Sequence, residues 1–435
     1  MFYVQLFSAL GTAQNKIIIR KRKEPKKNQT KRIKNFQAKL NNMKEPLTIL
    51  CTGGATGYLA SFLSEAVDKF NASKDKKENV KFIPTSRMML DIGTDPSNTK
   101  SNDIVVLRYE TSQDISQAAS TIYDLKPNVI VHTAALASPA KCEQEPMKAM
   151  IANCPKGLLE AIDLAQEMDD IQGNSTKITS SKWTLPMFIY ISTDQVYQGD
   201  DNSSGRVFVH KNKTSEINED KCSKEPQQKL WPPIPSYDLL TPVNEYAKSK
   251  LAFERLIIDR QSKNKPTKIE KTNYIILRAS NMIGPKSPKT GQGRFLQWLD
   301  SSIHKIQGKN YEMNHVNLFL DEFRSFVYVR DVAKVILLIS LSLLSETSPK
   351  LWKSVYNLGG PQNLSRYELG QLVVQHKGLL IEETNVLGIP KGKLVGASYN
   401  SPLDIGMDST DLENEFEHFQ LTPMEVAVKE SLESK

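Results

Sequence analysis

Tyr246 and Lys250 stand four residues apart in the segment TPVNEYAKSKLAFERL, residues 241–256. Positions i and i+4 of a helix share a face, so a helix here would point the phenol and the ammonium group in one direction. A free phenol has a pKa of about 10, and a neighbouring cation favours the phenolate and lowers that value. The pair is therefore a candidate for proton transfer. Among 14 tyrosines one such pair is also expected by chance, so the rest of the chain must decide.

A glycine-rich turn follows the first apolar segment. The sequence LTILCTGGATGYLASFLSEAVDKF, from Leu47, changes from an apolar strand to a glycine turn and then to an amphipathic helix. Small residues let such a turn bend tightly and let its backbone approach a pyrophosphate, while the helix N-terminus directs free N–H groups at the phosphates. The pattern predicts a dinucleotide-binding site, whose contacting residues would be Gly54, Thr56, Gly57, Tyr58 and Leu59.

The segment NVKFIPTSR, residues 79–87, has the pattern of a second strand. NAD-binding proteins usually carry an acidic residue here for the ribose 2′-hydroxyl, whereas this chain has Ser86 and Arg87. The planar donors of an arginine suit a 2′-phosphate, which favours NADP(H) over NAD(H) as the cofactor. The alternative is an ordinary surface arginine at the end of a strand.

Three later apolar segments also end in small or polar residues. Residues 126–138 end in the small residues Thr133, Ala134 and Ala135, which leave room for a nicotinamide ribose. Residues 186–200 and 270–285 form two more strands, and the first of these places Thr193 at its carboxyl end, where parallel sheets bind ligands. Strands that alternate with helices predict an α/β fold with a doubly wound parallel sheet.

Six segments, taken in order, resemble the extended short-chain dehydrogenase/reductase family. They are GATGYLA, VIVHTAALASPAKCEQEP with Asn153 after it, ISTDQVYQG, PVNEYAKSKLAFE, ILRASNMIG and FVYVRDVAKVI. The chain is most similar to the dTDP-4-dehydrorhamnose reductase group, which includes the regulatory beta subunit of methionine adenosyltransferase, over about residues 47–430. The resemblance implies an NADP-binding Rossmann domain for residues 47–284 and a mainly substrate-binding part for residues 285–435.

The resemblance also implies a role for each candidate catalytic residue. Tyr246 would give a proton to a carbonyl oxygen as hydride arrives from the nicotinamide, and Lys250 would also hold the nicotinamide ribose. Thr193 would donate a hydrogen bond to the substrate oxygen, with Asp194 orienting it. Asn153 would belong to the cofactor site.

Residues of the C-terminal part are weaker candidates. Arg278, Arg294 and Arg324 could bind anionic substrate groups, although salt bridges or solvation explain each of them more simply. Asp331 is expected to position backbone. In SRYELGQLV, Ser365 and Glu368 have the spacing of a capping box at a helix start.

Two functions compete. The first is an NADP(H)-dependent reductase that acts on a carbonyl of a nucleotide sugar or related metabolite. The second is a non-catalytic NADP-binding regulatory subunit that docks on methionine adenosyltransferase and raises S-adenosylmethionine synthesis. The intact Thr193, Tyr246 and Lys250 favour the reductase. Epimerase or dehydratase chemistry fits less well, because Gln195 rather than an acidic residue follows Asp194.

Charge and cysteine content limit other classes of function. Of the net charge of +8, residues 1–46 supply about +10, so the remainder is near neutral and does not indicate a nucleic-acid-binding fold. No stretch of about 18 apolar residues is present, so no membrane span is expected. The cysteines show no metal-ligand spacing, and they indicate buried thiols in a reducing compartment and no metal site; they are Cys51, Cys142, Cys154 and Cys222.

Three polar regions lie outside the strand and helix pattern. Residues 1–46 are expected to be a disordered basic tail, read as an organelle presequence, a nuclear localisation patch or a solvated extension before Met43. A cytoplasmic location is the default, and the tail leaves organelle and nuclear targeting open. Residues 165–185 and 200–236 are expected to be surface loops. The second would emerge beside Thr193, as a lid, a partner-docking loop or inert filler.

Overall fold

The computed structural model describes ten stretches of the chain: residues 45–72, 79–87, 104–175, 183–199, 240–263, 273–306, 315–344, 354–393, 399–416 and 419–434. Of the predicted basic tail, only residues 45 and 46 belong to these stretches. The predicted loop over residues 200–236, with Cys222, lies outside the described residues.

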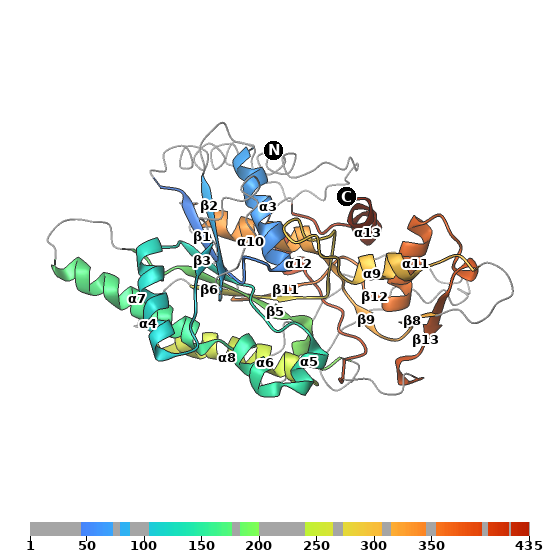
Figure 1. Ribbon diagram of the computed structural model, residues 1–435, viewed down its shortest axis with the longest axis horizontal. Coiled ribbons are helices and arrows are strands. Elements are labelled where there is room, and N and C mark those ends of the chain that lie inside the picture. The colour runs from blue at the N-terminus through green and yellow to red at the C-terminus, as the bar shows by residue number, and fades with distance from the viewer. Residues whose placement is uncertain are drawn as a thin grey trace, which may run out of the picture.

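A parallel sheet of seven strands forms the centre of the molecule (Figure 1). In chain order the strands are β1 (Leu47–Thr52), β2 (Val80–Ser86), β3 (Val105–Val106), β4 (Val129–His132), β5 (Met187–Thr193), β6 (Tyr274–Ala279) and β11 (Val355–Leu358). Their spatial order is β11-β6-β5-β4-β1-β2-β3, and every neighbouring pair is parallel. Every residue of β4, β5 and β6 is buried, as expected of strands covered on both faces. The predicted doubly wound sheet is confirmed.

Helices cover both faces of the sheet (Figure 1). One face carries α3 (Tyr58–Ala72), α10 (Val329–Ser342) and α12 (Thr410–Glu415), whose apolar side chains share one core with the sheet. The other carries α4 (Ser112–Leu125), α7 (Lys156–Ser175) and α8 (Glu245–Lys263), which share a second core. The short helices α5 (Pro139–Gln144) and α6 (Pro146–Asn153) pack beside α8.

The C-terminal part has an apolar core of its own, beyond the ends of the strands (Figure 1). Its helices are α9 (Phe295–Ser302), α11 (Arg366–His376) and α13 (Met424–Glu433). Its strands form three pairs: β7 (Met282–Ile283) with β10 (Val327–Tyr328), β8 (Val316–Phe319) with β13 (Val386–Ile389), and β9 (Phe323–Arg324) with β12 (Leu364–Ser365). Single 3-10 turns cover Asp194–Val196, Ile381–Glu383 and Lys391–Lys393. The predicted capping box is present at the start of α11, where Ser365 and Glu368 each accept the other's backbone N–H.

The structure corrects two predicted boundaries. The predicted boundary at residue 284 does not separate the two parts, because the chain returns to the sheet after it. The later elements α10, β11 and α12 complete the Rossmann part. Residues 165–175, predicted to be loop, continue α7 as far as Ser175. The polar composition was misleading, since one face of this helix packs on α4 through residues such as Leu158, Ile162 and Ala165.

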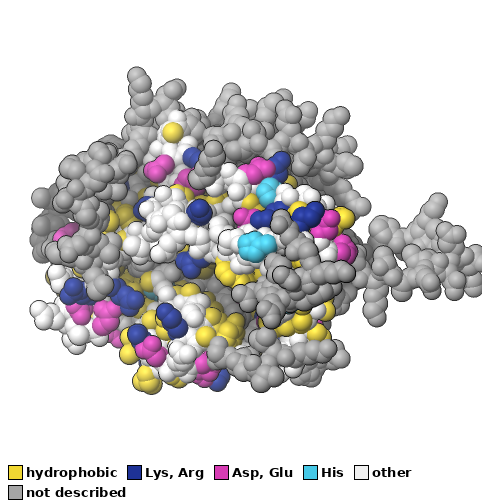
Figure 2. Space-filling view, turned by 45° about the vertical axis from the view of Figure 1, so that its right-hand side comes forward, with side chains coloured by type: hydrophobic (Ala, Val, Ile, Leu, Met, Phe, Trp, Pro, Cys, Tyr) yellow, Lys and Arg dark blue, Asp and Glu magenta, His cyan; other side chains and the backbone are white. Residues whose placement is uncertain are grey.

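Other expectations concern the surface and the cysteines. Within the described stretches, no helix is both long and apolar enough to cross a membrane. Cys51, Cys142 and Cys154 are buried free thiols, and the described residues contain no group of three or more side chains suited to a metal ion. Figure 2 shows basic and acidic side chains intermingled on the face it presents, over the part of the chain that it colours.

Candidate active site

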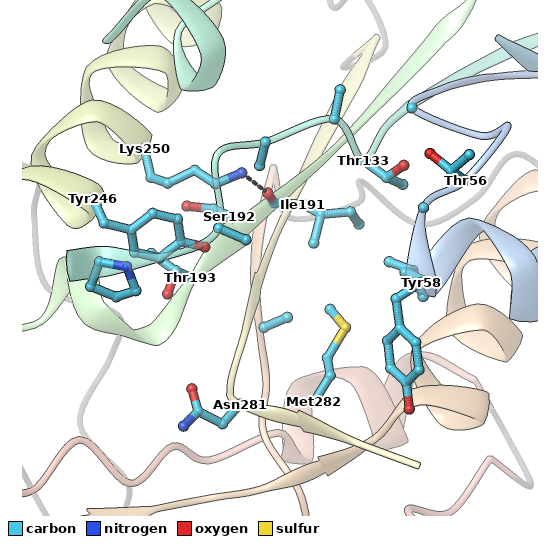
Figure 3. A pocket seen from close by; sticks show the side chains of 18 of the residues that line it. Thr56, Tyr58, Thr133, Ile191, Ser192, Thr193, Tyr246, Lys250, Asn281 and Met282 are labelled. Atoms are coloured by element: carbon cyan, nitrogen blue, oxygen red, sulfur yellow. Dashed lines mark hydrogen bonds between the residues drawn. The ribbon is translucent and has the colours of Figure 1, made fainter. Parts of the chain in front are cut away.

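A pocket of about 1080 Å³ lies at the carboxyl ends of the strands, between the glycine turn and α8 (Figure 3). The strands on either side of it, β1 and β4, are adjacent at the point where the strand order reverses, which is where doubly wound sheets bind ligands. The sheet end, the start of α3, the start of α8 and the C-terminal part all contribute to its wall.

The glycine turn forms a cradle that side chains would fill. Gly53 has φ +73°, and a Cβ on it would lie 2.9 Å from Cα of Ala134 at the end of β4. A Cβ on Gly57 would lie 2.5 Å from the carbonyl oxygen of Gly53. The exposed backbone of this turn leads directly into α3, whose first residue is Tyr58. A bare backbone before a helix N-terminus fits the pyrophosphate of a dinucleotide.

The predicted turn residues divide into two groups. Thr56, Gly57, Tyr58 and Leu59 line the pocket, whereas Gly54 does not. Gly54 packs against β2 instead, since a Cβ there would lie 2.8 Å from Cα of Pro84. The Tyr58 hydroxyl donates a hydrogen bond to the carbonyl oxygen of Pro285 at 2.9 Å, so this side chain ties α3 to the segment after β7.

The predicted 2′-phosphate residues and small residues also lie in the pocket wall. Ser86 and Arg87 line it at the end of β2. Thr133, Ala134 and Ala135 line it after β4. The segment after β4 leaves no room for a side chain at position 53, because a Cβ there would meet the backbone of Ala134.

Asn153 is not brought to the pocket wall. Its side chain is fully buried and holds other parts of the protein. The amide oxygen accepts from Leu136 N at 2.7 Å, and the amide nitrogen donates to Leu136 O at 3.2 Å and to Ser249 Oγ at 3.0 Å. Asn153 therefore fixes the segment after β4 against α8, and its predicted direct contact with a cofactor does not fit this geometry.

Tyr246 and Thr193 meet in the pocket (Figure 3). The Tyr246 phenol and the Thr193 hydroxyl both line it, close enough for Thr193 to affect the pKa of the phenol. Thr193 in turn donates to the Asp194 carboxylate at 3.0 Å and accepts from Gln195 N at 3.2 Å. Ser280, at the end of β6, donates to the other Asp194 oxygen at 2.7 Å. The predicted orienting role of Asp194 has its geometric basis here.

Lys250 lies beside this pair, but its charge does not act as predicted. Its Nζ donates to the carbonyl oxygen of Ile191 at 2.8 Å and lies 4.8 Å from the centre of the Tyr190 ring. Burial lowers the pKa of Lys250 to about 7. Burial, followed by the charge of Asp194, raises the pKa of Tyr246. Lys250 is not among the groups that shift the Tyr246 pKa, so the expected lowering of the phenol pKa by the lysine is not found; burial sets the direction instead.

The start of α8 is tied to the end of β5 by side-chain amides. Asn244 accepts a hydrogen bond from Ala247 N at 2.9 Å and so caps the helix. Its Nδ2 donates to Gln195 Oε1 at 2.8 Å and to Asn400 O at 2.9 Å. These bonds fix Tyr246 relative to Thr193.

A buried ion pair holds the middle of α8 against the sheet. Glu254 and Arg278 are both fully buried and lie 2.7 Å apart. Ser192 donates to the same carboxylate. Arg278, a predicted candidate for substrate binding, is therefore committed to the helix–sheet interface and does not line the pocket.

The C-terminal wall of the pocket is rich in arginine. It includes Arg294, Arg324 and Arg366, so two of the three arginines predicted as candidates are found there. Arg294 lies over the Tyr58 ring at 4.9 Å. Arg324 is 1% exposed, and its Nε has no hydrogen-bond partner within the described part of the chain.

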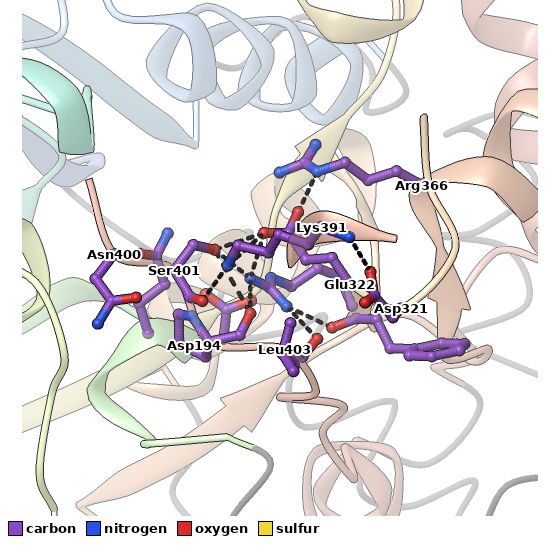
Figure 4. Close-up of polar contacts among 12 residues, drawn as sticks. Asp194, Asp321, Glu322, Arg366, Lys391, Asn400, Ser401 and Leu403 are labelled. Carbon is purple, nitrogen blue, oxygen red and sulfur yellow. Dashed lines mark hydrogen bonds and ion pairs between the residues drawn. The ribbon is translucent and has the colours of Figure 1, made fainter. Parts of the chain in front are cut away.

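One carboxylate balances part of this positive charge (Figure 4). Glu322 pairs with Arg324 at 3.4 Å, with Lys391 at 3.6 Å and closely with Arg366. Burial alone would raise the pKa of Glu322, but Arg366 and Arg324 outweigh it and hold that pKa at about 2. Asp194 also interacts with Arg324, and Asp321 with Lys391, so carboxylates lie beside each of the three cations around Glu322.

Sequence reasoning missed several residues of the wall. Ala279, Ser280 and Asn281 line the pocket at the end of β6, and the rule that ligands bind at strand ends was sufficient to find them. Arg366, Tyr399 and Ser401 come from loops and a helix start in the C-terminal part, where no local pattern marks them. Asp331 behaves as expected, since its carboxylate accepts from Thr422 N at 2.7 Å and from Thr422 Oγ1 at 2.9 Å.

Solved structures of sugar-nucleotide enzymes share this fold. The chain is similar to dTDP-4-dehydrorhamnose reductase from Bacillus anthracis in complex with NADP, with 18% identity and a TM-score of 0.54 over 89% of this chain and 99% of that one. It is also similar to dTDP-glucose 4,6-dehydratase from B. anthracis in complex with NAD, with 15% identity and a TM-score of 0.53 over 89% of this chain and 95% of that one. A third similar structure is UDP-glucose 4-epimerase from Thermotoga maritima with UDP-glucose, with 18% identity and a TM-score of 0.54 over 89% of this chain and 97% of that one.

The sequence itself identifies the family. No curated protein matches it significantly. The model of the NAD dependent epimerase/dehydratase family matches residues 53–359, from the glycine turn to the end of β11. That span includes the cradle, Thr193, Tyr246 and two arginines of the C-terminal wall, Arg294 and Arg324, but not Arg366. The predicted membership is thus confirmed: the chain belongs to the NAD dependent epimerase/dehydratase family, within the extended short-chain dehydrogenases/reductases.

Proposed function

We propose that this protein is an NADP(H)-dependent reductase of a carbonyl group on a nucleotide sugar, of the dTDP-4-dehydrorhamnose reductase type. The observation that supports the proposal is that Thr193, Tyr246 and Lys250 line the same pocket as the glycine cradle. A proton donor, a hydroxyl and a dinucleotide cradle in one cavity are the parts that carbonyl reduction requires.

The residues of this chain have separable tasks in that reaction. A nicotinamide held beside Thr133, Ala134 and Ala135 would supply hydride for the carbonyl carbon. Tyr246 would give its phenolic proton to the carbonyl oxygen of a substrate bound beside Tyr246 and Thr193. Lys250, whose Nζ already donates to Ile191 O, would have N–H groups left to hold the nicotinamide ribose.

The cofactor assignment depends on the other end of the pocket. The end of β2 presents Arg87 to the pocket rather than an acidic side chain, which supports NADP(H) over NAD(H). Gly53, Thr56 and Gly57 would hold the pyrophosphate. The residues Thr133, Ala134 and Ala135 would lie under the nicotinamide ribose.

The C-terminal wall supports an anionic substrate. Arg294, Arg324 and Arg366 line it, and Glu322 neutralises only part of their charge. Guanidinium groups bind phosphates through paired N–H donors, so the diphosphate of a nucleotide sugar suits this wall. Gln195 cannot act as an acid or base, which supports simple reduction over elimination of water.

The test is turnover. Purified protein with NADPH is given dTDP-4-dehydrorhamnose and other 4-dehydro nucleotide sugars, and NADPH absorbance and product mass are followed. We expect NADPH consumption and a product that is heavier by two hydrogens. NADPH binding without turnover, with co-purification of a methionine adenosyltransferase that persists in Tyr246→Phe, would support the regulatory-subunit hypothesis instead.

A further inference from the structure

The pocket wall farthest from Tyr246 contains two arginines from neighbouring strand ends. Leu107 N donates to Ser86 O at 2.9 Å, which holds the ends of β2 and β3 side by side. Arg87 follows the first strand and Arg108 the second, and both line the pocket. The wall at this end therefore carries two positive charges from adjacent chain segments.

The two guanidinium groups have different partners. Arg108 Nε donates to the carbonyl oxygen of Arg87 at 2.8 Å, which fixes the direction of the side chain. A guanidinium has five N–H donors, so four remain for a ligand. Within the described stretches Arg108 makes no ion pair. Arg87 instead lies 3.6 Å from the Glu110 carboxylate.

Glu110 is held in place by the backbone. Its Oε2 accepts from Tyr109 N at 3.0 Å, while its Oε1 is the atom nearest Arg87. Glu110 lines the same pocket. A carboxylate of the protein thus occupies an anion-binding side of Arg87, and a ligand phosphate must compete with it.

We infer that Arg108 is the second arm of the site for the cofactor 2′-phosphate, and that Glu110 is an internal competitor that weakens this site. The inference rests on the proposed NADP(H) cofactor and adds the residue that determines its selectivity. A phosphate dianion placed between Arg87 and Arg108 would accept charge-assisted hydrogen bonds from both. NADH has a hydroxyl at that position and would gain little from Arg108.

The test measures binding and needs no substrate. The full chain is titrated with NADPH and with NADH, followed by nicotinamide fluorescence, in the wild type and in Arg108→Ala, Arg108→Lys and Glu110→Gln. Lys81→Ala is the matched control, because Lys81 is an exposed cation on β2 outside the pocket wall. Circular dichroism establishes that each variant is folded.

We expect Arg108→Ala to weaken NADPH about 10-fold, the value of one charge-assisted hydrogen bond, with NADH changed less than about 3-fold. Arg108→Lys should recover part of the loss, and Glu110→Gln should tighten NADPH about 3-fold because a repelling charge is removed. Lys81→Ala should change neither Kd.

Equal weakening of both dinucleotides in Arg108→Ala would overturn the inference, as would a wild-type preference for NADH or no binding of either dinucleotide. An intact NADPH preference without turnover of any nucleotide sugar would leave the inference standing and overturn the proposed function. Sugar reduction with NADH as the preferred donor would overturn the inference and the NADP(H) assignment, and would leave the carbonyl-reductase activity standing.

Discussion

The hydroxyl of Thr193 donates its hydrogen bond to the Asp194 carboxylate at 3.0 Å. The Thr193 oxygen accepts from Gln195 N at 3.2 Å, and the Tyr246 phenol lies beside it. The phenol, the Thr193 hydroxyl and the Asp194 carboxylate are therefore neighbours. This proximity couples the charge of Asp194 to the proton of Tyr246.

Asp194→Asn should lower the pKa of Tyr246. Burial raises that pKa first, and the negative charge of Asp194 raises it further because a second anion nearby disfavours the phenolate. An asparagine removes the charge and still accepts from Thr193. Phenolate absorbance against pH, with Tyr246→Phe subtracted, measures the shift. Ser280→Ala keeps the charge and is the control; an unchanged titration in Asp194→Asn would contradict the coupling.

Lys250→Met should stabilise the fold while it impairs the site. Burial lowers the Lys250 pKa from 10.5 in the unfolded chain to about 7 in the folded protein. Below pH 7 the lysine is therefore charged in both the folded and the unfolded protein, and folding bears the full free-energy cost of burying the charged ammonium. As the pH rises from 7 to 10.5 that cost is relieved. We expect the substitution to raise the free energy of unfolding by about 1–4 kcal/mol at pH 6 and by less at pH 10.

Urea unfolding at the two pH values measures this effect. Lys248→Met, on an exposed turn of the same helix and paired with Glu245 at 2.7 Å, is the control and should change stability little. A loss of stability in Lys250→Met at pH 6 would mean that its bond to Ile191 O outweighs the burial of its charge.

Asn153→Ala should affect folding more than cofactor binding. The substitution removes the partner of Leu136 N and one of the two partners of Leu136 O, in a half-buried position, which costs about 1–3 kcal/mol of unfolding free energy. Since Asn153 does not line the pocket, the Kd of NADPH measured below the unfolding transition should change by less than about 3-fold. A large loss of NADPH affinity in a stable variant would restore the direct contact predicted from sequence.

Asn244→Asp should release Gln195 without removing the cap of α8. An aspartate still accepts from Ala247 N, but it cannot donate to Gln195 Oε1. In the wild type the Asn244 Nδ2 group donates to Gln195 Oε1 and so fixes the orientation of the Gln195 amide. The Gln195 amide nitrogen is then the group that can donate hydrogen bonds to a ligand in the pocket. We expect the KM for a nucleotide sugar to rise about 10-fold with kcat changed less. A fall in kcat at constant KM would instead indicate that the position of Tyr246 is disturbed.

The fold was predictable because its local signals agree with each other. The glycine turn, the apolar strands and the strand ends at Thr133 and Thr193 each indicate a doubly wound sheet and a site at its carboxyl edge. These signals are short-range in sequence, and the parallel topology then brings the strand ends together.

The remaining features depend on contacts between distant segments. Asn153 resembles a site residue in sequence, and only the packing of α6 on α8 assigns it to Leu136 and Ser249. The Tyr246–Lys250 spacing correctly places both on one helix, yet the depth of burial reverses the expected pKa effect. Arg366 and Ser401 enter the site through loops that carry no periodic pattern.

The most direct test of the central claim compares hydride transfer and cofactor binding in Tyr246→Phe. Single-turnover oxidation of bound NADPH by dTDP-4-dehydrorhamnose should slow by about 100- to 10,000-fold, because no other group described at the Thr193 hydroxyl can supply the proton. The Kd of NADPH should change by less than about 3-fold, since the phenol is not needed to hold the dinucleotide. A Tyr246→Phe enzyme that reduces the sugar at the wild-type rate would contradict the assignment of Tyr246 as the proton donor.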